Sequence, residues 1–210
     1  MNELNLLMYS QYGEEFIILD FFGQDSKGIV VDIGAADGIR YSNSRHLIEL
    51  GWSGVLVEPH PTYFDNINEL YKDTDSVTVI NAAVYSEEGE MPFYVYGRDE
   101  HAQVSTLSKD FKERVVKVHG DKFEENPTMV SAIKLSTVLQ HAGRVDFLSV
   151  DCEGVDMDVI KSNDWNLYRP TLVCVEHSMP KSELHAFMNS VNYTFLTETQ
   201  GNTFFKDSLS

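Results

Sequence analysis

Short apolar runs, each followed by a segment of helical periodicity, are the feature that most constrains the fold of this chain. The runs are apolar on both faces and rich in β-branched residues, which is typical of buried parallel strands. The segments between them repeat apolar residues every three or four positions, as on one face of a helix. Strands that alternate with helices predict an α/β fold with a doubly wound, mostly parallel sheet. The expected strands are residues 28–33, 54–57, 77–80, 145–150 and 171–175.

Two parts of the chain depart from this alternation. Residues 193–197 and 203–206 flank Gln200-Gly201-Asn202, a turn-forming sequence, and predict a C-terminal antiparallel hairpin. Residues 91–96 predict an extra strand, and the segment that follows, at about 97–131, is polar and too long for an ordinary loop. We interpret that segment as an insertion over the active face.

Length and charge narrow the classes of function. The 210 residues favour a single domain that spans residues 1–210, and a hydrophobic content of 42% is that of a globular protein. The net charge of −17 opposes binding to nucleic acid and to anionic membranes. No apolar run approaches the ~18 residues that a membrane span needs, and the first residues carry an acid where a signal peptide carries basic residues. We therefore expect a cytoplasmic protein with neither nucleic acid nor membrane as a partner, and the sequence does not indicate an oligomeric state.

The first two expected strands end in residues that are suited to a nucleoside. Ligands of doubly wound sheets bind at the carboxyl ends of the strands. The first strand leads into a glycine-containing turn at residues 32–38, and the second ends in Glu58-Pro59. An acid at the end of the second strand accepts hydrogen bonds from ribose hydroxyls, and Glu58 lies 24 residues after Gly34, close to the ~20 expected.

The residues of the turn indicate which nucleoside binds. Ala36 stands where a dinucleotide site needs glycine for close approach of the pyrophosphate. Asp32, Asp37 and Glu58 would instead favour S-adenosyl-L-methionine, which has no phosphate and carries a sulfonium and an ammonium. A nicotinamide-dependent oxidoreductase on a similar sheet is the alternative, and Ala36 and the lack of basic residues in the turn oppose it.

Several motifs, in order along the chain, resemble the FkbM family of S-adenosylmethionine-dependent methyltransferases. The resemblance implies a class I methyltransferase fold, which is Rossmann-like and has a seven-stranded sheet whose last strand is antiparallel. It also implies O-methylation of a hydroxyl on a sugar, glycan or small-molecule acceptor. A module that binds the cofactor without catalysis is the alternative. The motifs are residues 10–15 (SQYGEE), 30–38 (VVDIGAADG), 42–44 (SNS), 51–59 (GWSGVLVEP), 81–84 (NAAV), 146–154 (DFLSVDCEG) and 175–176 (VE).

The resemblance also implies roles for single residues. Asp32, Gly34 and Glu58 would hold the methionine and ribose portions. From the turn itself we expect that a side chain at Gly34 would fill space that the cofactor needs, and that the backbone there needs dihedral angles open only to glycine. Ala82 and Ala83 would lie near the adenine. Gln11 would close the pocket from above, although its motif also suits a capped helix start. The predicted cofactor-binding residues are Gln11, Asp32, Gly34, Ala36, Asp37, Glu58, Pro59, Ala82 and Ala83.

The fourth and fifth expected strands end in acids and a histidine. Because neighbouring parallel strands end at the same edge of the sheet, Asp151, Glu153, Glu176 and His177 are expected to converge where an acceptor would lie. Methyl transfer to a hydroxyl requires alignment and removal of its proton, so Asp151 or His177 is the predicted base. Clustered carboxylates repel one another, so either one of them holds a proton or a divalent cation lies among these four residues. We predict the acid cluster and assign no metal.

Overall fold

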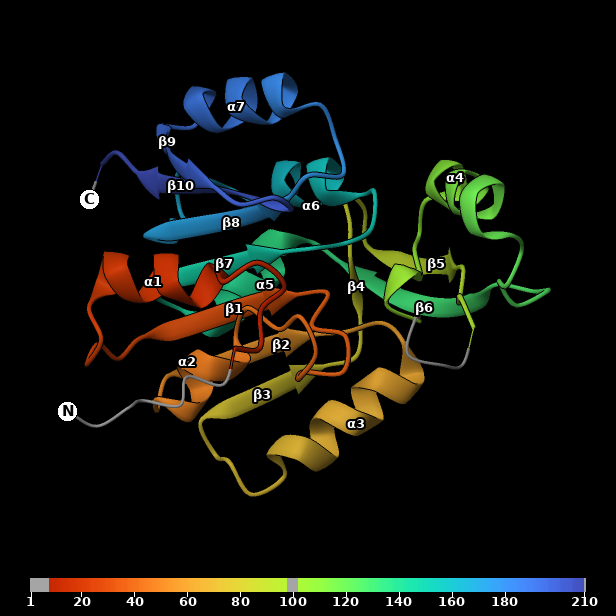
Figure 1. Ribbon diagram of the computed structural model, residues 1–210, viewed down its shortest axis with the longest axis horizontal. Coiled ribbons are helices and arrows are strands. Elements are labelled where there is room, and N and C mark those ends of the chain that lie inside the picture. The colour runs from red at the N-terminus through yellow and green to blue at the C-terminus, as the bar shows by residue number, and fades with distance from the viewer. Residues whose placement is uncertain (1–7, 98–101, 210) are drawn as a thin grey trace.

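A seven-stranded sheet forms the centre of the computed structural model, which describes residues 8–97 and 102–209 (Figure 1). The strand order is β3-β2-β1-β7-β8-β10-β9, and all neighbours are parallel except that β10 is antiparallel to both β8 and β9. The doubly wound sheet and the C-terminal hairpin are thus confirmed. The strands are β1 (Ile29–Ile33), β2 (Ser53–Val57), β3 (Val77–Ile80), β7 (Phe147–Val150), β8 (Leu172–Glu176), β9 (Tyr193–Glu198) and β10 (Asn202–Asp207).

Helices cover both faces of this sheet, which explains why its central strands are apolar on both sides. Alternate residues of one strand enter different cores: Val30 packs into the core beneath the first three helices, and Val31 packs into the core on the opposite face. The first set is α1 (Glu14–Phe22), α2 (Arg45–Glu49) and α3 (Pro61–Tyr71), and the second is α5 (Leu135–Ala142), α6 (Asp156–Lys161) and α7 (Lys181–Ser190).

A second, three-stranded sheet lies beyond the carboxyl ends of the central strands, at the right of Figure 1. It has the order β4-β6-β5 and consists of β4 (Ala83–Val84), β5 (Gly89–Phe93) and β6 (Thr128–Ile133). The polar segment predicted at about 97–131 therefore ends in a strand, because residues 128–131 belong to β6. The alternation of buried Val130 with Met129, which is 55% exposed, fits a strand that is covered on one side.

The rest of that segment contains a short 3₁₀ helix, η1 (Ala102–Val104), and the helix α4 (Lys109–His119). The Ser108 hydroxyl oxygen caps α4 by accepting a hydrogen bond from the Phe111 N–H at 3.1 Å, and the helix ends before Gly120. Residues 98–101 of the predicted insertion lie outside the described residues. The strand predicted at 91–96 is shorter, because β5 ends at Phe93 and only isolated bridges continue it.

The topology places the carboxyl ends of β1, β2, β7 and β8 at one edge of the sheet. The chain leaves β1 toward β2 on one side and reaches β7 on the other, so the strand order reverses at β1. Such a reversal opens a crevice at the strand ends where ligands bind. No helix within residues 8–97 and 102–209 has the length and apolar character of a membrane span.

Candidate active site

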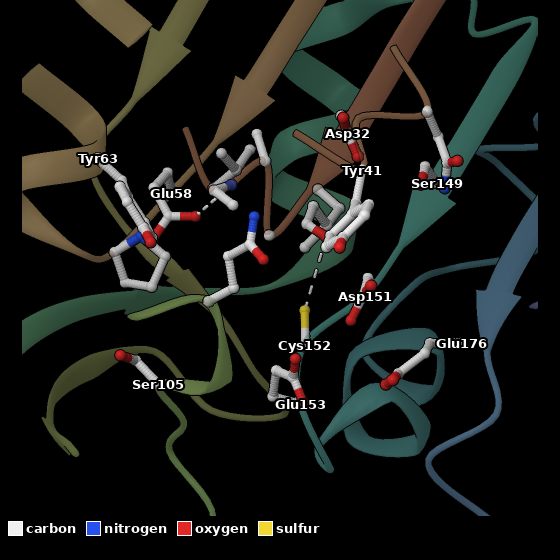
Figure 2. A pocket seen from close by; sticks show the side chains of 18 of the residues that line it. Asp32, Tyr41, Glu58, Tyr63, Ser105, Ser149, Asp151, Cys152, Glu153 and Glu176 are labelled. Atoms are coloured by element: carbon white, nitrogen blue, oxygen red, sulfur yellow. Dashed lines mark hydrogen bonds between the residues drawn. The ribbon is translucent and has the colours of Figure 1, made fainter. Parts of the chain in front are cut away.

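A cavity of about 410 Å³ lies at the carboxyl ends of these strands (Figure 2). Glu58 and Tyr63 lie at one side of it, and Asp151, Glu153 and Glu176 gather at the other. Two predicted site residues, Asp37 and His177, do not line it. The predicted residues that do are Gln11, Asp32, Gly34, Ala36, Glu58, Pro59, Ala82, Ala83, Asp151, Glu153 and Glu176.

The glycine turn after β1 packs directly against the end of β7. Gly34 has a φ of +83°, and a Cβ built on it would lie 1.9 Å from the carbonyl oxygen of Asp151. Glycine is therefore required here by the left-handed backbone and by the neighbouring strand. The space that a side chain would fill is occupied by the protein's own backbone, which differs from the role in cofactor approach that we expect from the turn.

Glu58 connects the first two strand ends. It is 5% exposed, and its carboxylate oxygens accept hydrogen bonds from the N–H groups of Ala36 at 2.8 Å and His60 at 2.7 Å. Burial raises the pKa of Glu58 to about 8, although the two N–H donors favour the ionised form. The carboxylate thus holds the β1 turn in place and faces the cavity, where a ribose can reach it.

Asp32 belongs to a buried polar network that the sequence motifs only partly indicated. It is 4% exposed, accepts a hydrogen bond from the Ser44 hydroxyl at 2.6 Å, and has a pKa that burial raises. The Asn43 side-chain amide donates to the Ser149 hydroxyl at 3.1 Å, and both of these residues line the cavity. The motif at residues 42–44 was the available signal for this network, but it carried no predicted role.

Asp37 has a turn-forming role instead of the predicted contact with the cofactor. Its Oδ1 accepts hydrogen bonds from the N–H groups of Ile39 at 2.9 Å and Arg40 at 2.7 Å. Such bonds from an aspartate to the backbone two and three residues on are typical of turns. The carboxylate is thereby directed to the backbone and away from the cavity.

The acids at the ends of β7 and β8 converge as predicted. One carboxylate oxygen from each of Asp151, Glu153 and Glu176 lies within 4.8 Å of the others. Burial and the neighbouring carboxylates raise the pKa of Asp151 to about 7 and that of Glu176 to about 11. At neutral pH the cluster therefore retains protons, with Glu176 protonated and Asp151 close to half ionised.

His177 does not join these acids. Its Nε2 lies 2.7 Å from the Thr203 hydroxyl on β10, and its N–H donates to the Gly201 carbonyl at 2.8 Å. Successive side chains at a strand end point to opposite sides, so the direction that brings Glu176 to the cavity takes His177 away from it. Burial lowers the pKa of His177. We therefore place neither the base nor a metal ligand at this residue.

The loop after β7 is held from two sides. Asp156, which is fully buried, accepts hydrogen bonds from the N–H groups of Cys152 at 2.7 Å and Gly154 at 3.3 Å. From the other side, the Thr106 hydroxyl donates to the Glu153 carbonyl at 2.7 Å, and Phe111 of α4 packs against Gly154. The segment predicted as an insertion thus supports the acid cluster, and its residues Gln103, Val104, Ser105 and Leu107 line the cavity.

Apolar side chains also line the cavity. They include the predicted residues Ala82 and Ala83, together with Tyr63 of α3, which lies beside Glu58 in Figure 2, and Phe93 of β5. Tyr63 is 9% exposed and Phe93 is 4% exposed. The sequence placed Tyr63 on the apolar stripe of a helix, and for the aromatic residues of 91–96, Phe93 among them, it left open a core role or a surface that binds a sugar. A helical stripe and a strand end look the same whether they face a core or a ligand.

Comparisons with known proteins show the family to which this chain belongs. The family model described as the methyltransferase FkbM domain matches residues 32–197. The chain belongs to the FkbM methyltransferase family. No curated protein matches the sequence.

Solved structures of methyltransferases share the fold of this FkbM family protein. Methyltransferase FkbM from Methylobacillus flagellatus has a TM-score of 0.55 at 13% identity; the match covers 86% of this chain but 44% of that one, so this chain spans less than half its length. A candidate methyltransferase from Escherichia coli has a TM-score of 0.51 at 8% identity, and a candidate RNA methyltransferase from Pyrococcus horikoshii has 0.50 at 13%. These two matches cover 94% and 95% of this chain and 88% of each neighbour.

The cavity of this FkbM family protein fits the methyl donor that such a family implies. Arg40 is the only lysine or arginine among the described residues that line it, whereas Asp32, Glu58, Asp151, Glu153 and Glu176 are acids. A cavity lined by acids and by apolar side chains suits an adenine nucleoside that carries a sulfonium and an ammonium, and it disfavours a pyrophosphate. The residues present therefore fit S-adenosylmethionine.

Proposed function

We propose that this protein transfers a methyl group from S-adenosylmethionine to a hydroxyl group of a glycan or another small molecule. The observation that carries the proposal is the position of Asp151, a carboxylate at the end of β7 that faces the cavity beside Glu153 and Glu176 and has a pKa of about 7. A general base is most effective when its pKa lies near the working pH.

Cofactor binding is assigned to the side of the cavity that contains Glu58. S-adenosylmethionine, when bound, supplies a methyl group on a positively charged sulfur. Glu58 accepts hydrogen bonds from the ribose hydroxyls, and Ala82 and Ala83 with the two nearby aromatic rings contact the adenine. Asp32 also lines the cavity and would face the methionine portion.

The acid cluster is assigned to the acceptor. Asp151 would take the proton of the acceptor hydroxyl as the hydroxyl oxygen gains the methyl group. The bond between methyl carbon and sulfur would break, so the donor would leave as S-adenosylhomocysteine and the proton would remain on the Asp151 carboxyl group. Glu176 is protonated at neutral pH and donates a hydrogen bond, and burial with the neighbouring Asp151 also raises the pKa of Glu153. A polyhydroxylated acceptor satisfies both groups, because each of its hydroxyls can donate and accept.

The charge of the chain supports an acceptor other than nucleic acid. With a net charge of −17 and an acidic cavity, the protein repels a phosphate backbone. The description of the Pyrococcus horikoshii neighbour as an RNA methyltransferase applies to that protein, and we do not propose RNA as the acceptor here.

The experiment that tests the proposal is methyl transfer from S-adenosylmethionine with a labelled methyl group. The protein is incubated with panels of glycans and small alcohols, and labelled products are isolated and treated with mild base. A base-stable methyl ether, formed by the wild type and not by Asp151→Asn, is the expected result. A base-labile methyl ester, labelled nitrogen or labelled RNA would contradict the proposed acceptor class.

A further inference from the structure

The N-terminal segment at residues 8–13 lies over the cavity and contacts the turn between β9 and β10. Gln11 and Tyr12 line the cavity together with Gly201 and Asn202 of that turn. We propose that Glu14 is a positioning residue that holds this segment in place by binding the turn. This inference rests on the proposed function, because it assigns to Glu14 a role in cofactor affinity.

One carboxylate makes hydrogen bonds both to the segment and to the turn. The side chain of Glu14 is fully buried, and its Oε1 accepts hydrogen bonds from the Thr199 hydroxyl at 2.7 Å and the Asn202 side-chain amide at 2.9 Å. Its Oε2 accepts from the N–H of Tyr12 at 2.8 Å. Glu14, at the start of α1, thus links Tyr12 of the N-terminal segment to Thr199 and Asn202 near the turn between β9 and β10.

The charge of Glu14 strengthens these contacts. Burial acts to raise its pKa, but the hydrogen bonds from Thr199, Asn202 and Tyr12 outweigh burial, and the net effect lowers the pKa. The carboxylate is therefore ionised at neutral pH, and hydrogen bonds to an ionised acceptor are stronger than neutral ones. Its place in the first turn of α1 adds a favourable interaction with the helix dipole.

Few apolar contacts hold the segment on their own. Met8 is 55% exposed, Tyr12 is 38% exposed and Gln11 is exposed. The fit of Tyr12 to the turn is nevertheless close, because a Cβ on Gly201 would lie 2.5 Å from its ring. Glu15 holds the two residues that precede Gln11, because its carboxylate accepts hydrogen bonds from the N–H groups of Tyr9 at 2.7 Å and Ser10 at 3.0 Å. Polar contacts, and those of Glu14 in particular, therefore set where Gln11 and Tyr12 lie.

The test compares Glu14→Gln with the wild type in three measurements. These are the dissociation constant for S-adenosylhomocysteine by calorimetry, hydrogen exchange of the peptide that contains residues 8–13, and the thermal midpoint. The glutamine side chain keeps the shape of Glu14, but its NH2 group would face one of the groups that now donate a hydrogen bond to the carboxylate. We expect the dissociation constant to rise about tenfold, as for loss of one charge-assisted hydrogen bond, and exchange of residues 8–13 to accelerate.

A matched control lies at the other end of β10. Asp207 is also buried, with its side chain 6% exposed, and pairs with Arg169 far from the cavity lining. Asp207→Asn should lower the thermal midpoint without changing the dissociation constant or the exchange of residues 8–13. Thr199→Val removes one donor to Glu14 and also the hydroxyl that accepts a hydrogen bond from the Asn202 N–H at 3.0 Å, and it should give a smaller effect in the direction of Glu14→Gln.

A second variant covers failure of Glu14→Gln to fold. Gly201→Ala should displace the exposed Tyr12 ring without touching Glu14, and it should weaken binding in the same way. Equal affinity in the wild type, Glu14→Gln and Gly201→Ala would overturn the positioning role, as would an equal loss in Asp207→Asn. If the wild type does not bind S-adenosylhomocysteine, the proposed function fails. The role of Glu14 is then tested by hydrogen exchange alone, and an unchanged exchange rate of residues 8–13 in Glu14→Gln would overturn it.

Discussion

Gly34 marks the point where the β1 turn and the end of β7 come into contact. Alanine at position 34 would be strained in two ways: its backbone would be left-handed, with a φ of +83°, and its Cβ would collide with the Asp151 carbonyl oxygen. Gly120 has a similar φ of +78° but open space where a side-chain carbon would lie, so Gly120→Ala is a matched control for backbone strain alone. We expect Gly34→Ala to lower the free energy of unfolding by about 2–3 kcal/mol more than Gly120→Ala, measured by urea denaturation. Equal losses would contradict the contact.

Asp151 carries the proposed chemistry, and its titration gives the reaction a signature. Because the ionised form accepts the proton, turnover should rise with pH through about 7, the pKa of this group. Asp151→Asn should lower turnover by ~10²-fold or more at any pH, with affinity for S-adenosylhomocysteine retained. Steady-state rates across pH, on an acceptor found by labelled transfer, measure both effects.

Two further experiments distinguish Asp151 as the base from two alternatives, which are His177 as the base and a divalent cation bound by the acids. His177→Ala should leave turnover and its pH profile close to those of the wild type, because His177 lies outside the cavity lining. Activity should also survive a chelator. Loss of activity on chelation and its return with magnesium, calcium or manganese would instead place a divalent ion among Asp151, Glu153 and Glu176, whose oxygens are close enough to share one.

At the scale of elements, the sequence predicted the strands and helices whose apolar residues recur with a clear local period. The five buried strands and the hairpin were predictable because their runs are apolar on both faces or flank a turn sequence. The strands β4 and β6 were not predicted, since two residues give no period and β6 follows a long polar segment. The helix α5 follows β6 directly and was missed with it.

The candidate site divides in the same way. Glu58, Asp151 and Glu176 were predictable because each ends a strand, and strand ends meet at one edge of a parallel sheet. Tyr63 and Ser149 were missed, and Phe93 was weighed but favoured as a core residue, because their contact with the cavity depends on how separate elements pack. The position of His177 could have been corrected from sequence alone, since it follows Glu176 and adjacent side chains at a strand end alternate in direction.

The helix α4 should influence catalysis through the loop that follows β7. Phe111 packs against Gly154, so Phe111→Ala should loosen the loop that carries Asp151 and Glu153. We expect turnover to fall about tenfold through misalignment, hydrogen exchange of residues 151–155 to accelerate, and affinity for S-adenosylhomocysteine to hold. Val118→Ala on the same helix is the control, because Val118 is 74% exposed. Identical rates in the two variants would show that α4 does not support the loop.

For the whole molecule, the buried acids predict how stability depends on pH. Each of these groups has a pKa that burial raises, so the folded state binds protons more tightly than the unfolded state, whose acids titrate at their ordinary values. Stability is therefore greatest below those values and falls as pH rises through the folded values, which are about 7 for Asp151 and about 8 for Glu58. The groups are Asp32, Glu58, Asp151, Glu153, Asp156 and Glu176.

Urea denaturation at about pH 5.5 and about pH 8.5 measures this dependence. We expect the free energy of unfolding to be larger at the lower pH, by on the order of 2 kcal/mol. The net charge of −17 acts in the same direction, because self-repulsion of the compact state grows as acids ionise. A free energy of unfolding that rises between these two pH values would show that the acids are paired or solvated in the folded state.

The most direct test of the cavity as a methyl-donor site is calorimetric titration of the wild type with S-adenosylhomocysteine and, separately, with NAD. We predict that one S-adenosylhomocysteine binds per chain, that NAD does not bind, and that Glu58→Gln weakens the first interaction about tenfold, because the amide NH2 group replaces an oxygen that accepts hydrogen bonds from the ribose. Binding of NAD with no binding of S-adenosylhomocysteine, or equal affinity in Glu58→Gln, would contradict the assignment.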